Sequence, residues 1–254
     1  MNINVLCERP DQAAKLAQFE AVNAVYSKDR PKGCSKKWIQ VMPYVMRDEP
    51  KAEKVHIAKG ANGVLVRNYE EMGFVKESEF RGDVIADASL YSFNSEAAEA
   101  LKEAGITKET LPLELNVHEM RKRGTLGTEL VIYGRTPLMI TANCLYLTEH
   151  HKCGRNIPEG YSLMLTDRKN VKFPTVCECR YCYNVIYNSV PVSLHKEIEV
   201  IESLGVDSVR LNFTTETPEE AKMITEYFVD LFNGVDDEPP FKDYTRGHFR
   251  KGVE

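Results

Sequence analysis

Residues 63–87 of the sequence, GVLVRNYEEMGFVKESEFRGDVIAD, contain two short apolar runs separated by a polar segment. The runs at 63–67 and 83–87 are rich in valine and isoleucine and have the length of buried strands. Residues 69–77 between them predict a helix. Two strands joined by a helix form the unit of a parallel sheet, so this stretch predicts an α/β fold.

The same alternation extends over the rest of the chain. Asn94 and Thr217 are predicted to cap helices, Gly105 and Gly205 to end them, and a short charged helix is expected at residues 50–58. Eight strands with helices in most of the gaps fit a closed (β/α)8 TIM-like barrel. The other six strands are predicted at residues 3–7, 24–26, 38–45, 110–115, 129–133 and 208–213.

Length and composition are consistent with one barrel domain over residues 1–254. A chain of 254 residues with 43% hydrophobic content can bury one large core. An open doubly wound sheet is the alternative, but the sequence lacks the glycine-rich phosphate turn that such sheets use to bind nucleotides. The barrel is therefore the predicted fold.

The charge balance excludes some functions. A net charge of -5 argues against a protein coated in basic groups for non-specific nucleic-acid binding. The most basic stretch, residues 27–37, is interpreted as a solvated loop, with a substrate- or RNA-facing patch as the alternative. The sequence has neither an 18-residue apolar segment nor the pattern of a signal peptide, so a cytoplasmic protein without membrane contact is expected.

The cysteines are concentrated in one segment. Five of the seven lie between residues 144 and 182, inside a segment at 136–193 that follows the seventh predicted strand. Residues 162–166 and 171–176 of this segment predict a hairpin. An odd number of cysteines in a chain without a secretion signal favours reduced thiols and metal ligation. We therefore expect a cysteine-rich, metal-binding insertion in the barrel.

The spacing of these cysteines favours a four-iron four-sulfur cluster. Clusters take four thiolates at uneven spacings, whereas zinc sites more often have two short Cys-x2-4-Cys pairs. Zinc is the alternative metal, and free or disulfide-forming cysteines are the third interpretation. Cys177 could replace Cys179 as a ligand, since a gap of one residue makes it hard for both to bind one metal. The predicted ligands are Cys144, Cys153, Cys179 and Cys182.

Polar side chains stand where several predicted strands end. Loops after the strands form the active face of such barrels, so these residues are candidates for substrate binding. A helix cap or a loop hydrogen bond explains any one of them more simply, but their number favours a site. Arg67 and Arg135 would suit a carboxylate or phosphate, and hence a small anionic substrate or a nucleic acid. The candidates are Arg67, Asp87, Glu114, Asn116, Tyr133, Arg135 and Asn212.

The end of the chain adds two candidates. Residues 244–249, YTRGHF, are unlike a polar disordered tail, so the tail is predicted to pack back over the barrel. Arg246 and His248 would then approach an anionic group of the substrate. The alternative is simple docking of Tyr244 and Phe249 onto apolar surface.

Several segments, which together extend over nearly the whole chain, resemble one known family. They are specific in combination, although each is short. The segments are GVLVRN at 63–68, IAD at 85–87, LPLELN at 111–116, VIYGRTPLM at 131–139, LTDRK at 165–169, CYNVIYNS at 182–189 and YTRGHFRKGVE at 244–254. They resemble the collagenase-like peptidase U-32 family, and specifically the second barrel of its long bacterial members.

The resemblance implies a barrel fold and a cluster held by four cysteines. Because long members carry another barrel upstream, an upstream barrel or a homologous partner subunit is an expected partner. The family label implies a protease, while other members look like oxygen-independent hydroxylases of RNA bases or of quinone precursors. We expect an iron-sulfur enzyme for such hydroxylation of RNA bases or a small aromatic substrate. The alternatives are a collagenase-like peptidase (hydrolase) and a non-catalytic, cluster-bearing assembly module.

Overall fold

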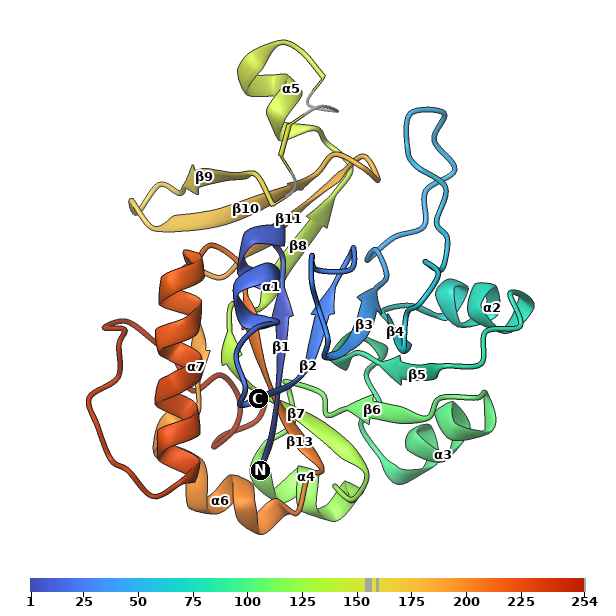
Figure 1. Cartoon of the computed structure of the whole chain (residues 1–254). Coiled ribbons are helices and arrows are strands. Elements are labelled where there is room, and N and C mark those ends of the chain that lie inside the picture. Colours follow the sequence, from blue (N-terminus) through green and yellow to red (C-terminus); the bar gives the residue numbers. More distant parts are fainter. Residues whose placement is uncertain (154–156, 159, 254) are drawn as a thin grey trace.

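Eight parallel strands form a closed barrel in the computed structural model, which describes residues 1–153, 157–158 and 160–253 (Figure 1). Each strand pairs with the next along the chain, the last pairs with the first, and the β6–β7 pairing completes the ring. The strands are β1 (Asn2–Cys7), β2 (Val22–Ser27), β3 (Lys37–Val41), β4 (Gly63–Val66), β5 (Asp83–Ala86), β6 (Lys108–Thr110), β7 (Thr128–Gly134) and β13 (Ser208–Phe213). The predicted TIM-like barrel is therefore confirmed.

Helices lie on the outside of the barrel in most of the gaps between strands. The predicted caps are confirmed: Asn94 accepts a hydrogen bond from Ala97 N, and Thr217 accepts one from Glu220 N. The helices are α1 (Pro10–Leu16), α2 (Tyr69–Glu77), α3 (Ser95–Glu103), α4 (Val117–Arg123), α6 (Ile198–Leu204) and α7 (Pro218–Phe232), with short 3-10 turns η1 (Ala88–Leu90) and η2 (His195–Glu197).

The helix predicted at residues 50–58 is wrong. This segment forms a turn followed by irregular backbone. Its charged sequence has no apolar stripe to hold a helix against the barrel, and Glu53 N instead donates to the carbonyl of Arg180, 2.8 Å away. The loop after β3 therefore contacts the cysteine segment.

The sixth strand is shorter than predicted and ends earlier. The backbone N–H of Leu111 still donates to Glu129 O at 2.8 Å, but Pro112 has no N–H with which to continue the ladder. The C-terminal end of β7 pairs instead with β12 (Val192–Ser193), which runs antiparallel to it. Residues 111–115, expected in the strand, are therefore available to line a space beside β7.

The segment at 136–193 forms a second, antiparallel sheet. Its strands are arranged β8-β11-β10-β9 and lie over the end of the barrel at which the parallel strands finish (Figure 1). The predicted hairpin is confirmed by the pairing of β9 with β10. Residues 154–156 and 159 of the segment lie outside the described residues. Its elements are β8 (Pro137–Thr141), α5 (Leu145–His150), β9 (Ser162–Thr166), β10 (Lys172–Glu178) and β11 (Tyr183–Tyr187).

Candidate functional site at the barrel mouth

A row of buried charges begins where the second sheet meets the barrel. Lys28 Nζ lies 2.9 Å from Glu8 Oε2 and also pairs with Glu178 of β10. Tyr187 of β11 donates its hydroxyl to Glu8 Oε1 at 3.0 Å. Burial alone would raise the pKa of Glu8, but the charges of Lys28 and Arg67 lower it below its usual range. The second sheet is thus held to the mouth by buried ion pairs and hydrogen bonds.

The row continues into the barrel lumen. Arg67 lies 3.9 Å from Glu8 Oε1 and 3.2 Å from Asp87 Oδ2, and Arg210 lies 2.5 Å from Asp87 Oδ1. Arg210 is also 3.0 Å from Glu129 Oε2, a contact between charges without hydrogen-bond alignment. Burial alone would raise the pKa of Asp87, but the two guanidinium groups lower it. Acidic and basic groups therefore alternate, and each buried charge has an opposite neighbour.

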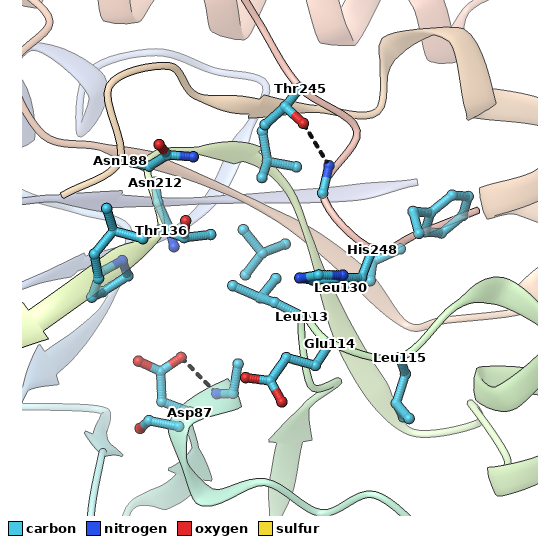
Figure 2. A pocket seen from close by; sticks show the side chains of 18 of the residues that line it. Asp87, Leu113, Glu114, Leu115, Leu130, Thr136, Asn188, Asn212, Thr245 and His248 are labelled. Carbon is cyan, nitrogen blue, oxygen red and sulfur yellow. Dashed lines mark hydrogen bonds between the residues drawn. The ribbon is translucent and has the colours of Figure 1, made fainter. Parts of the chain in front are cut away.

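A cavity of about 620 Å³ lies beside this row (Figure 2). Its size is typical of a small-molecule site. The loops after β5 and β6, strands β7 and β8, and the C-terminal tail form its walls, and Tyr44, Arg210 and Asn212 are among its inner residues. Residues 113–115, which follow β6, form part of one wall. Apolar walls come from Leu113, Leu115, Leu130, Leu138, Met139 and Ile140.

Five of the nine predicted substrate-binding residues line this cavity. Asn212 accepts a hydrogen bond from Arg210 Nε at 3.0 Å through its side-chain oxygen, and among the described residues its amide nitrogen has no partner and can donate to a ligand. Glu114 has no hydrogen bond or ion pair within the described part of the chain, and Figure 2 shows its carboxylate projecting into the cavity. The five residues are Asp87, Glu114, Asn212, Arg246 and His248.

The other four predicted residues lie elsewhere. Arg67 is buried, with its guanidinium carbon 3.8 Å from the centre of the Tyr44 ring. Asn116 caps α4. Tyr133 packs in the core and donates its hydroxyl to Glu216 at 3.2 Å. Arg135 donates to the carbonyls of Asn188, at 3.1 Å, and Ser189. These residues position the walls and the core and do not line the cavity.

Several residues at the mouth were not among the predicted site residues. Lys28 belongs to the basic stretch interpreted as a solvated loop, yet it is buried. Asn188 and Thr245 line the cavity, and both belong to segments that carried the family resemblance. Their place in these segments was the one signal in the sequence that could have identified Asn188 and Thr245 as site residues.

The C-terminal tail packs against the barrel. Thr245 N donates to Pro191 O, and Ser193 N donates to Thr245 O, at 2.9 and 2.8 Å. Arg250 binds the buried carboxylate of Glu197, with Arg246 3.7 Å from the same group. The tail therefore forms a fixed wall of the cavity.

The cysteines of the second sheet lie near one another. The pKa of Cys179 is raised to about 11, first by burial and then by the nearby charges of Cys144, Cys153, Glu178 and Cys182. Burial likewise raises the pKa of Cys177 to about 12. Thiolates at the predicted ligand positions would be suitable donors for a cluster or for zinc. Among the described residues, however, no three His, Cys, Asp or Glu side chains are arranged to hold a metal ion.

The fold and the cavity define the class of this protein. It is an α/β barrel of the TIM type with a ligand-sized cavity at the carboxyl ends of its strands, where barrels of this class carry their sites. The model of a family described as Peptidase family U32 matches residues 45–251, and the chain belongs to that family. Neither a curated protein nor a solved structure matches the chain. In the described part of the chain, every helix is too short or too polar to cross a bilayer.

Proposed function

We propose that this U32 family protein is an iron-sulfur enzyme for oxygen-independent hydroxylation of an RNA base or a small aromatic substrate. The observation that carries the proposal is that β8 connects the cavity to the cysteine segment. Residues 137–140 of this strand line the cavity, and Cys144, a predicted ligand, lies three residues beyond its end at Thr141. A substrate in the cavity and a cluster at the cysteines would then share one structural element.

A cluster would be held by Cys144, Cys153, Cys179 and Cys182, with Cys177 as the alternative to Cys179 and zinc as the alternative metal. When bound, an iron-sulfur cluster supplies one-electron transfer. All seven cysteines are free thiols, which supports a reducing, cytoplasmic location as part of the proposal.

The cavity supports a flat, mostly apolar ligand with a polar edge. Apolar side chains form much of its walls, and amide and carboxylate groups lie among them. Arg246 at the rim is about half exposed, so it would meet a phosphate of RNA or of a small anionic substrate while the ring enters the cavity. The proposal includes an upstream barrel or a homologous subunit as partner.

The experiment is metal analysis of protein purified without oxygen. We expect a brown sample with visible thiolate-to-iron absorption and about four iron per chain, with matching sulfide. A colourless sample with stoichiometric zinc would contradict the cluster. A cluster-bearing protein that modifies neither RNA nor aromatic substrates would instead favour the non-catalytic assembly module.

A collagenase-like peptidase is the second candidate, because the matching family is described as a peptidase family. Ser193 does hydrogen-bond to His195 Nδ1 at 2.8 Å, but both side chains are buried. His195 Nε2 has no partner among the described residues, so the pair lacks the third group that orients a catalytic base. We expect no gelatin hydrolysis by the pure protein, and cluster-dependent hydrolysis would reverse the order of the candidates.

A further inference from the structure

The imidazole of His248 has a defined tautomer in the neutral state. Its Nδ1 lies 2.9 Å from the carbonyl oxygen of Gly252. A carbonyl oxygen can only accept a hydrogen bond, so Nδ1 must carry the proton. In neutral imidazole the other nitrogen, Nε2, then keeps its lone pair and can only accept.

The tail geometry that sets this tautomer depends on Gly252. Its φ is +75°, and a Cβ at this position would lie 2.9 Å from Asn116 Nδ2, at the cap of α4. The nitrogen of Gly252 also donates to His248 O at 2.7 Å, and Val117 N donates to Phe249 O at 2.9 Å. The turn is therefore closed on itself and fixed to the start of α4.

Nε2 of His248 and the carboxylate of Glu114 serve the same cavity. Both residues line it, His248 from the tail and Glu114 from the loop after β6, and Figure 2 shows both side chains projecting into it. Within the described residues Glu114 has no partner. The neighbouring acid Asp87 is different, because Arg67 and Arg210 already occupy its oxygens.

We propose that Glu114 and His248 Nε2 form a hydrogen-bond acceptor site, which selects a ring whose edge presents N–H or O–H donors. Gly252 is the positioning residue, because its carbonyl fixes which nitrogen of His248 faces the ligand. This inference rests on the proposed function only in taking the cavity as the ligand site. A ring that fills the cavity displaces water from the two acceptors. If the ring has no donors, the acceptors lose these hydrogen bonds without replacement, so such a ring is rejected.

The tautomer is tested by NMR of protein labelled with ¹⁵N-histidine, in which two-bond correlations distinguish the two nitrogens. The chain has six histidines, and His248→Phe identifies the signals of interest. We expect the neutral His248 ring to carry its proton on Nδ1. Gly252→Ala should change this pattern, whereas Gly234→Ala, at a φ of +80° with open space around the Cβ, should leave it intact. A proton on Nε2 in the unmodified protein would overturn the proposal.

The ligand class is tested with indole and 1-methylindole, which differ in one N–H donor. We expect indole to bind the full protein about five-fold more tightly, the net effect of one hydrogen bond, with shifts in the His248 signals. His248→Phe keeps a flat ring and should reduce this preference, because only the carboxylate of Glu114 is then left to accept the N–H. Equal affinity for both probes, or binding of neither, would overturn the proposal. Neither measurement depends on iron content, so failure of the cluster hypothesis would be seen separately.

Discussion

The ammonium group of Lys28 forms a buried ion pair with the carboxylate of Glu178. Lys28 follows β2 of the barrel and Glu178 ends β10 of the second sheet, and their side chains are only 8% and 6% exposed. Since Lys28 also binds Glu8, one cation joins the two sheets across the barrel mouth.

Lys28→Met should destabilise the protein by about 3–5 kcal/mol, because it leaves two carboxylates buried without their shared cation. Urea unfolding measures the change. The matched control is Lys15→Met, which removes an exposed pair with Glu219 and should cost about 0–1 kcal/mol. Equal losses of stability from the two substitutions would show that the ion pair between Lys28 and Glu178 does not stabilise the contact between the second sheet and the barrel.

Glu71 should make stability depend on pH. Burial raises its pKa to about 8, from an ordinary value of 4.5. Because the pKa of Glu71 is raised in the folded state, the protonated carboxyl group favours folding. Its contribution to the free energy of unfolding is therefore complete below pH 4.5 and is lost as the pH rises to about 8. Glu71→Gln cannot ionise, and its free energy of unfolding should exceed that of the unmodified protein increasingly across this range.

Denaturant unfolding at several pH values measures the Glu71 effect. Glu70→Gln is the control, because Glu70 is the exposed neighbour on the same helix and should leave the pH profile unchanged. Parallel profiles for Glu71→Gln and the unmodified protein would rule out a raised pKa.

Serine substitution of a cluster ligand should remove the colour and the iron, because three remaining thiolates rarely hold a cluster. Cys34→Ser should keep both, since Cys34 donates to Lys36 O in the loop after β2, in another part of the chain. Iron analysis and visible absorption check the result, and bleaching by Cys34→Ser would contradict the ligand assignment. The substitutions expected to bleach are those at Cys144, Cys153 and Cys182, and comparison of Cys177→Ser with Cys179→Ser identifies the fourth ligand.

Arg246→Ala should weaken substrate binding with little loss of stability. Its contact with Glu197 is 3.7 Å long and the side chain is about half exposed, so the pair contributes about 0–1 kcal/mol. Phe249→Ala, in contrast, removes a buried ring and should undock the tail. Hydrogen exchange of residues 244–252 distinguishes the two variants. Early melting of Arg246→Ala with full activity would make Arg246 purely structural.

Much of the fold was predictable because its signals are local. Alternating apolar runs and helical stripes depend on neighbours two to four positions apart, as in residues 63–87, and caps such as Thr217 act within a single turn. The barrel and the β9–β10 hairpin followed from such patterns. The helix expected at residues 50–58 failed because its backbone found partners in a distant segment.

The sequence by itself determined the order of the eight barrel strands and of most helices between them, the family and the clustering of the cysteines. Only the tertiary structure decided which polar side chains share a cavity. Tyr133 and Arg135 are two positions apart in one motif, yet Tyr133 packs in the core and Arg135 holds a loop. Glu114 and His248 are far apart in sequence and line one cavity only because β6 ends at Thr110 and the tail packs back against the barrel. Pairing between such distant segments depends on how the whole chain packs, which no local pattern contains.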